Sequence, residues 1–394
     1  MPITGPRHRN VPHDRRTVWL LPVSLETETL FAALGQDFAI APEPLRRTVT
    51  TWFDTFDWRL YSRDFLLFHD QTAWRLVNRH TAEEMASLDT RGRDGWRFCQ
   101  EFPPSRVRSL LEPLLENRRL LRLFRNETTS VGRRILNSDH KTVAFATVET
   151  HRLERSGISV PTLCLQGIRG YDHDFDAIRS FFSHHGIKEQ VGPYCYFAQG
   201  VGSGGRAPLD YSSKFRPVLR PDMTARQAMV VVFGDLLITM QRNEAGLIKD
   251  LDAEFLHDFR VAVRRTRSGL GQVRKVLPDG ATDFFRNGFA WLGEITGPAR
   301  DLDVYLQAEC SYLARLPEEL RPGLAPFFDE LRGRRVSERR RLVRRFASRK
   351  YRDLLAAWQK FLAAGGGSEE TTNSGLPVNQ LARRIIARRF SRLL

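Results

Sequence analysis

The spacing of hydrophobic positions divides the chain into two parts of different character. From Thr17 to about Tyr196, short alternating runs rich in β-branched and aromatic residues predict strands at 48–53, 65–69, 72–78 and 142–150. Helical spacing in the same region predicts helices at 26–35, 105–115 and 175–185. This mixture is typical of an α+β fold whose sheet is mainly antiparallel.

Beyond residue 220 the hydrophobic positions recur every three or four residues, and every predicted element is a helix. The predicted helices span 221–249, 254–278, 284–295, 302–316, 324–346, 351–362 and 377–394, with Gly297-Pro298 ending the third. Two segments rich in Gly, Ser and Pro or Thr predict flexible linkers. The predicted organisation is a disordered basic lead (1–16), an α+β domain (17–198), a linker (199–220), a helical bundle (221–364), a second linker (365–375) and a final helical segment (376–394).

The segment 254–278 carries two parallel rows of side chains. Its apolar row consists of Phe255, Phe259, Ala262, Val263, Thr266, Leu270, Val273 and Leu277. Its basic row consists of His257, Arg260, Arg264, Arg267 and Arg274, displaced by roughly a third of a turn. Arginines beside an apolar row can lay their stems on the core and direct their guanidinium groups along a groove. Such a groove favours a polyanionic ligand.

An ordinary solvated face is the alternative interpretation of this basic row. Two features argue against it: the row is nearly all of one sign, without acidic partners one turn away, and it uses Arg, whose planar fork matches phosphate oxygens. The pair His257–Asp258 would fit a metal-dependent phosphohydrolase only with companion histidines at ligand spacing, and the sequence shows none.

Composition narrows the class of protein. A formal net charge of +15 and a pI near 10.2 indicate an anionic partner, such as nucleic acid, an acidic membrane or a polyphosphate. Cys99, Cys164, Cys195 and Cys310 are scattered, which argues against a disulfide framework or a zinc site and favours a reducing cytoplasm. Residues 1–16 lack the apolar core of a signal peptide, and no window has the roughly 18 apolar residues of a spanning helix. We therefore expect a cytoplasmic protein without a membrane partner.

Three blocks in the helical part resemble one family. They are His257-x-x-Arg260-Val261-x-x-Arg264-Arg265-x-Arg267-Ser268-x-Leu270, then Trp291-Leu292 with Ala299-Arg300-Asp301-Leu302-Asp303-Val304, then Arg339-Arg340 through Ser348-Arg349-Lys350-Tyr351. In order and spacing they are similar to the CHAD (conserved histidine α-helical) domains. The resemblance implies a helical fold that binds inorganic polyphosphate through basic side chains without catalysis. That family has two four-helix halves around a basic pore, and this chain is expected to contain the first half and one further helix.

The resemblance and the basic rows together predict the binding residues. These are His257, Arg260, Arg264, Arg265, Arg267, Arg274, Arg300, Arg339, Arg340, Arg344, Arg384 and Arg388. Residues 332–352 hold eleven basic residues, opposed within that range only by Glu338. Because Arg335 and Arg339 interrupt the apolar row of this helix, they predict a charged channel, with a helix projecting into solvent as the alternative. No catalytic residue, metal site or cofactor is predicted.

The α+β part carries a second resemblance. The segments Trp52-Phe53-Asp54-Thr55-x-Asp57-x-Arg59-Leu60 and Trp74-Arg75-Leu76, basic residues at Arg122 and Arg125, and a strand ending near Glu149 are similar to CYTH domains, the triphosphate tunnel metalloenzymes. The resemblance implies an antiparallel β-barrel forming a tunnel. Those enzymes begin with an ExExK strand that binds the metal, whereas residues 17–23 contain no carboxylate and include Pro22. The later strand, 162–166, has no glutamate either.

Because Mg²⁺ is bound mainly by carboxylates, we expect a CYTH-like domain without its metal site and without catalytic activity. Its arginines are then either contacts for an anion or ordinary surface cations: Arg75, Arg122, Arg125, Arg133 and Arg134. The leading hypothesis is a polyphosphate-binding protein located at cytoplasmic polyphosphate granules. The alternatives are a metal-dependent inorganic triphosphatase or nucleotide-processing tunnel enzyme, and a nucleic-acid-binding protein. The sequence makes no prediction about oligomeric state.

Overall fold

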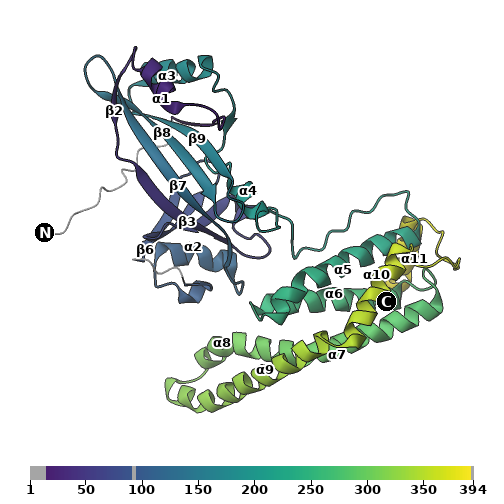
Figure 1. The fold of residues 1–394 in the computed structure, drawn as a ribbon. Helices are drawn as coiled ribbons and strands as arrows, with labels where there is room; N and C mark the ends of the chain where they lie inside the picture. The colour runs from purple at the N-terminus through teal and green to yellow at the C-terminus, as the bar shows by residue number, and fades with distance from the viewer. Residues whose placement is uncertain (1–14, 91–94, 392–394) are drawn as a thin grey trace. The chain divides into compact units, whose positions relative to one another are not determined.

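The computed structural model describes residues 15–90 and 95–391, and the chain divides into two compact units, 1–212 and 213–394 (Figure 1). Most of the expected basic lead, residues 1–14, lies outside the described residues. Its last two residues are ordered, because Arg16 begins the first strand and Arg15 forms an ion pair with Asp172 at 2.7 Å. Residues 392–394 at the end of the last predicted helix also lie outside the described part.

The first unit is built on a ten-stranded sheet in which every pairing is antiparallel, in the order β10-β1-β9-β8-β7-β3-β4-β5-β6, with β2 also paired to β7. Its strands are β1 (Arg16–Leu20), β2 (Ala39–Pro42), β3 (Arg46–Asp54), β4 (Phe65–His69), β5 (Ala73–Asn78), β6 (Glu84–Asp89), β7 (Leu121–Leu136), β8 (Thr142–Leu153), β9 (Ser159–Gly167) and β10 (Gln190–Val191). The predicted α+β class with a mainly antiparallel sheet is confirmed.

In the described part of this unit, four α-helices accompany the sheet: α1 (Thr27–Leu34), α2 (Arg106–Leu115), α3 (Asp172–His184) and α4 (Phe197–Gly202). Helices α1 and α3 lie at one end of the sheet and α2 at the other (Figure 1). Helices α1 and α3 share a hydrophobic core with Trp19, and α2 shares a second hydrophobic core with Phe53 and Trp74. Burial of these apolar faces positions the helices, since each is too short to be stable alone.

The segment 199–220, expected as a linker, begins inside this unit. Its first residues belong to α4, where Val201 is buried and a Cβ on Gly200 would overlap the ring of Phe124. Only a glycine allows α4 to approach β7 so closely. The linker interpretation is therefore wrong for residues 199–202, because a glycine there serves packing rather than flexibility.

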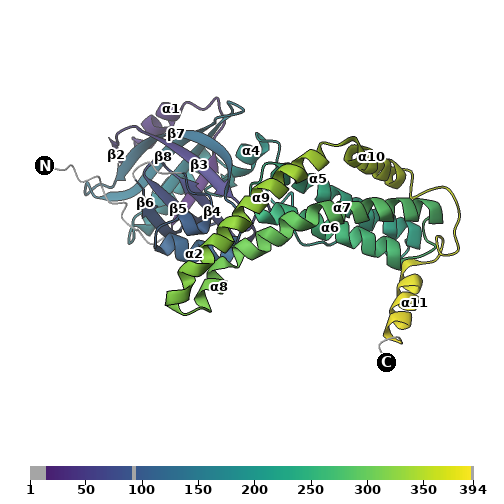
Figure 2. The ribbon, with the colours of Figure 1, turned by 90° about the horizontal axis from the view of Figure 1, so that it is seen from below.

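The second unit is helical throughout. Its helices are α5 (Ala225–Ile248), α6 (Ala253–Gln272), α7 (Asp279–Gln307), α8 (Glu309–Ala314), α9 (Ala325–Phe346), α10 (Arg349–Ala363) and α11 (Val378–Phe390). Helix α6 packs against both α5 and α7, α9 packs against α7, and α10 contacts all of α5, α7 and α9 (Figure 2). Trp358 contacts the rings of Phe233, Phe285 and Phe289 in the core. The predicted all-helical second part is confirmed.

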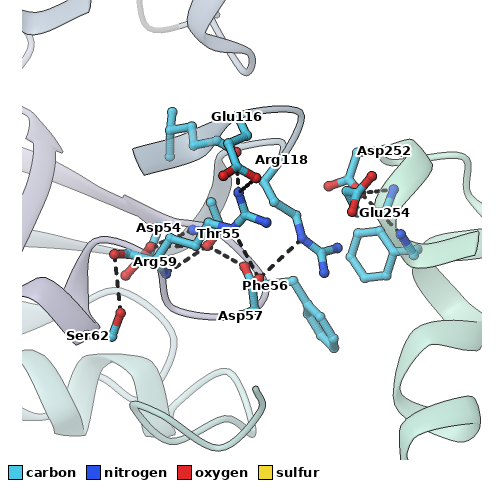
Figure 3. Close-up of polar contacts among 12 residues, drawn as sticks. Asp54, Thr55, Phe56, Asp57, Arg59, Ser62, Glu116, Arg118, Asp252 and Glu254 are labelled. Carbon is cyan, nitrogen blue, oxygen red and sulfur yellow. Dashed lines mark hydrogen bonds and ion pairs between the residues drawn. The ribbon is translucent and has the colours of Figure 1, made fainter. Parts of the chain in front are cut away.

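Side chains define where the main helices begin. Thr224 caps α5 and exchanges hydrogen bonds with Gln227. Asp252 caps α6 by accepting hydrogen bonds from the N–H groups of Glu254 at 2.9 Å and Phe255 at 3.3 Å (Figure 3). These contacts satisfy N–H groups that have no partner within the helix. Because Asp252 caps α6, it fixes the residue at which the helix begins, and with it the direction in which each side chain of α6 points.

Helix α7 corrects one prediction, because it continues through Gly297-Pro298 instead of ending there. A proline ring normally clashes with the Cβ and N–H of the preceding residue. Gly297 has no Cβ, so part of that clash is absent. Leu292, Thr296, Ala299 and Asp303 are buried on both sides of the proline, and their packing holds α7 as one helix.

The segment 365–375, expected as a flexible linker, is held against the ends of α5 and α6. Arg226 donates to the carbonyl groups of Gly367 and Glu369, and Asn373 N–H donates to the Lys275 carbonyl at 2.8 Å. The glycines 365–367 have φ angles of 77°, 81° and 96°, which side-chain-bearing residues rarely adopt. They turn the chain, and α11 then packs through Leu381 against Ala225 and Val276.

Candidate functional site

The strongest candidate site lies along α6. Its buried side chains face the bundle, while Arg264 and Arg267 are exposed and His257 and Arg260 are half-buried at the edge of the core. We refer to His257, Arg260, Arg264 and Arg267 as the α6 ridge. The ridge lies on one side of the helix because its residues are three or four positions apart.

Arg260 crosses from α6 to α7. Its Nη1 donates to the Gly293 carbonyl at 2.9 Å and to Thr296 Oγ1 at 2.8 Å. Arg267 approaches the same helix, since a Cβ on Gly293 would lie 3.1 Å from Arg267 Nη1. The two guanidinium groups therefore lie over a stretch of α7 that has little side-chain bulk.

Arg300 of α7 brings another cation to the start of the ridge. It lies 3.7 Å from Glu254 Oε1 and 3.4 Å from the Ala253 carbonyl, to which it donates. Burial lowers the pKa of His257, and Arg300 and Arg264 lower it further against the opposing effect of Glu254. Burial likewise lowers the pKa of Arg260, and Arg300 and Arg264 lower it further against the opposing effect of Asp301. These cations repel one another, so a bound anion would relieve the repulsion.

The exposed arginines of the ridge differ from several arginines of α9, because they have no acidic partner among the described residues. Across the described residues, no carboxylate lies within salt-bridge distance of Arg264, Arg267 or Arg274. On α9, by contrast, Arg332 contacts Glu309 at 2.6 Å and Asp329 at 2.8 Å. Arg334 pairs with Glu330 at 2.7 Å and Arg341 with Glu338 at 3.0 Å. The excess positive charge is therefore uneven along the basic segments.

The other predicted binding residues are not brought to the ridge as one group. Arg265 lies about 100° of helix rotation from the middle of the ridge, with its guanidinium 5.1 Å from the ring of Phe215. Arg274 lies two residues beyond Gln272, where α6 ends, and is exposed. Arg340 and Arg344 are exposed on α9, and Arg384 and Arg388 are exposed on α11.

Arg339 lies inside the bundle. It is 7% exposed, donates to the Leu247 carbonyl, and has Nε 3.3 Å from Asp250. Its neighbour Arg335 contacts Asp303 at 2.6 Å and Asp250 at 2.8 Å. These cations do interrupt the core, as the pattern of α9 indicated, but two carboxylates neutralise them. Nothing in the spacing of basic residues along α9 predicted Asp250 and Asp303 as the partners.

Every one of the five arginines singled out in the first unit is paired. The ion pairs are Arg75 with Asp70 (2.6 Å) and Glu84 (2.5 Å), Arg122 with Glu154 (2.8 Å), Arg125 with Glu154 (3.8 Å), Arg133 with Glu28 (2.7 Å) and Arg134 with Glu43 (3.4 Å). This pairing favours their interpretation as ordinary structural and surface cations.

The motif at 52–60 has a structural role. Asp54 is buried and accepts hydrogen bonds from the N–H groups of Thr55 (2.7 Å), Leu60 (3.0 Å) and Tyr61 (2.9 Å) (Figure 3). Burial raises its pKa to about 7, against the effect of these three donors. Asp57 Oδ2 forms ion pairs with Arg59 Nε at 3.2 Å and with Arg118 Nε at 3.4 Å. The motif thus closes the turn that follows β3.

Sequence reasoning missed a group of polar residues on β1, β8 and β9. Arg16 Nε lies 3.2 Å from Cys164 Sγ, and burial raises the pKa of Glu149 while Arg16 and Ser130 oppose the rise. The predicted disordered lead includes Arg16, but Arg16 is the first residue of β1. Within 15–90 and 95–391, no three His, Cys, Asp or Glu residues are grouped so as to hold a metal ion.

Comparison with known proteins finds a family model that matches most of the second unit. The family model described as the CHAD domain matches residues 232–394. A CHAD domain structure from the plant Ricinus communis is 24% identical, with a TM-score of 0.37, over 45% of this chain and 57% of that one. The match thus spans little more than half of the plant domain. A search of curated proteins found no match.

Two further structures are similar at lower identity. A candidate adenylate cyclase from Bacillus halodurans is 14% identical over 46% of this chain and 94% of that one, with a TM-score of 0.32. A candidate adenylyl cyclase from Hippeastrum, described as having a dominant triphosphatase activity, is 14% identical over 50% of this chain and 98% of that one, with a TM-score of 0.33. The ten-stranded antiparallel sheet is consistent with a CYTH-like domain. None of the helices that the structure describes is apolar over a length sufficient to cross a bilayer.

Proposed function

We propose that the CHAD domain of this chain binds inorganic polyphosphate along the α6 ridge. The observation that carries the proposal is the exposure of Arg264 and Arg267 without acidic partners in the described structure, beside Arg260 and Arg300. Guanidinium groups bind phosphate oxygens in pairs of hydrogen bonds. Ridge residues one turn apart, about 5.4 Å along the helix, would each meet a different part of a linear polyanion.

The ridge favours phosphate chains over nucleic acid. Proteins that bind single strands combine cations with aromatic side chains on which bases stack. The α6 ridge contains three arginines and a histidine, with no Phe, Tyr or Trp among its members. Competition between polyphosphate and single-stranded DNA at matched charge concentration would separate the two ligands, and we expect polyphosphate to displace DNA.

The test of the proposal compares two double variants of the full chain. Arg264→Gln with Arg267→Gln removes two exposed cations of the ridge. Arg334→Gln with Arg349→Gln removes two exposed cations that already pair with Glu330 at 2.7 Å and Asp353 at 3.2 Å. The net charge changes equally, and such surface pairs contribute little to stability.

We expect the ridge variant to bind long-chain polyphosphate roughly tenfold more weakly and to lower the salt dependence of log K by about two. The control variant should bind nearly as the parent does. Equal loss in both variants would mean that net charge alone attracts the ligand, and the proposed site would be wrong.

The cellular consequence would be association with polyphosphate granules. A fluorescent fusion should concentrate at granules in cells that store polyphosphate and spread through the cell when synthesis is blocked. The Arg264→Gln and Arg267→Gln variant should concentrate less than the Arg334→Gln and Arg349→Gln control. If the fusion protein were spread evenly through cells that contain granules, this part of the proposal would be wrong.

A further inference from the structure

We propose that Thr296 and Gly293 of α7 are positioning residues, which hold Arg260 in the orientation that meets a phosphate. This inference rests on the proposed function. Arg260 Nη1 donates to the Gly293 carbonyl at 2.9 Å and to Thr296 Oγ1 at 2.8 Å. Thr296 is completely buried, so it acts on the ligand only through Arg260.

The hydrogen bonds of Thr296 fix the direction of its hydroxyl group. Its Oγ1 donates to the Leu292 carbonyl at 2.7 Å, one turn earlier in α7, with the Gly293 carbonyl as a more distant acceptor at 3.3 Å. The single hydroxyl proton is thereby used, and the oxygen lone pairs remain for Arg260. Thr296 is therefore an acceptor toward the guanidinium group, which suits a cation.

The hydrogen bonds to α7 involve only Nη1 of the Arg260 guanidinium group, so Nε and Nη2 can bind a ligand. A guanidinium group has five N–H donors, of which Nη1 carries two. The two contacts of Nη1 use both of its protons. The Nε–H and the two Nη2–H groups form the other edge, which matches two phosphate oxygens. A side chain held in this way loses less freedom on binding than a mobile one.

Glycine at 293 also allows the neighbouring arginine to lie close. A Cβ on Gly293 would be 3.1 Å from Arg267 Nη1, whereas a Cβ on Gly297 would be 3.6 Å from Arg260 Nη1, an ordinary contact. The short stretch of α7 between these glycines therefore sets the separation between the guanidinium groups of Arg260 and Arg267.

The first test is Thr296→Val in the full chain, which keeps the side-chain volume and removes the acceptor. We expect affinity for long-chain polyphosphate to fall about fivefold and the salt dependence of log K to weaken by up to about one. Thr296→Ser keeps the hydroxyl group and should bind as the parent does. If the valine variant does not fold, Thr296→Ala replaces it, because alanine also lacks the acceptor and has the highest helix propensity.

The second test asks whether Thr296 acts through Arg260. In an Arg260→Gln background, Thr296→Val should cause no further loss of affinity, because the group that it positions is gone. Parent-like binding by Thr296→Val, or the same loss in both backgrounds, would overturn the inference while leaving the proposed function intact. Parent-like binding by Arg260→Gln as well as by the Arg264→Gln and Arg267→Gln variant would overturn both.

Discussion

At the scale of single residues, the charge that an arginine offers to a ligand depends on its spatial neighbours. Arg335 and Arg264 both lie on strongly basic helices. Asp250, 85 residues earlier in the chain, and Asp303 neutralise Arg335. Arg264 is exposed and has no carboxylate in reach among the described residues. A count of basic residues along a helix therefore overestimates the positive potential of α9 relative to that of α6.

A buried histidine in the first unit gives a prediction for stability against pH. His151 is 3% exposed, stacks on Tyr196 with ring centroids 3.9 Å apart, and lies 3.0 Å from Thr128 Oγ1. Burial lowers its pKa to about 4. In the unfolded chain a histidine has a pKa of about 6.5. Between these values the unfolded chain binds a proton that the folded chain does not, so stability falls as the pH decreases.

We expect His151 to contribute a loss of about 2 kcal/mol in the free energy of unfolding between pH 7 and pH 5. His151→Gln cannot titrate, so its stability should fall by about that much less over the same interval. Urea denaturation of both proteins at the two pH values measures the difference. Parallel losses in the parent and the variant would show that the imidazole is protonated in the folded protein.

At the scale of elements, periodicity predicted the helices best where one face is apolar. Helices α5 and α9 lie within a few residues of their predicted bounds because their buried side chains recur every three or four residues. Helix α6 begins as predicted but ends at Gln272, so Val273, Arg274 and Leu277 of the predicted rows lie beyond it. The long strand β7 was not predicted, because both of its faces carry polar residues. Its buried Asn126 accepts from Trp52 Nε1 at 2.7 Å, and Thr128 contacts His151. Such partners come from distant segments, so alternation does not reveal the strand.

The packing of α5 on α6 gives a prediction with an internal control. Gly246 is buried where a Cβ would overlap the ring of Phe255, whereas a Cβ on Gly234 of the same helix would have nothing within 4 Å. Alanine favours a helix by about 1 kcal/mol over glycine. Gly234→Ala should therefore raise the free energy of unfolding by up to about 1 kcal/mol.

Gly246→Ala should instead lower the stability by about 1–3 kcal/mol, because the crossing of α5 and α6 must open to admit the methyl group. Thermal denaturation followed by circular dichroism compares the two variants. A gain of stability in both variants would mean that the helices separate at little cost, and that the close approach at Gly246 does not limit the packing of the bundle.

At the scale of the whole molecule, the arginines singled out in the first unit differ from the exposed arginines of the α6 ridge in their acidic partners. The five arginines singled out on β5 and β7 all have acidic partners in the first unit, whereas Arg264 and Arg267 of the α6 ridge have none among the described residues. Spacing within α6 was sufficient to predict the ridge. It could not predict the contribution of α7, because Gly293 and Thr296 lie 33 and 36 residues from Arg260. A buried threonine carries no signal of its own in the sequence.

This difference predicts which unit a ligand stabilises. The chain divides into two compact units, so its thermal unfolding should show two transitions. Gly246→Ala identifies the transition of the second unit, because it should lower that transition alone. Ligand at about 100 times its dissociation constant adds about 2.7 kcal/mol to the unit that binds it, which corresponds to a shift of roughly 5–10 °C for a unit of this size.

Calorimetry of the full chain with long-chain polyphosphate should therefore raise the transition that Gly246→Ala lowers and leave the other unchanged. The Arg264→Gln and Arg267→Gln variant should show a smaller rise at the same polyphosphate concentration, since its ridge binds more weakly. A comparable rise in the transition of the first unit would place polyphosphate on the antiparallel sheet as well. In that case the ion pairs of Arg75, Arg122 and Arg133 would have to exchange their carboxylates for phosphate, which spectroscopy of the labelled arginine side chains would detect.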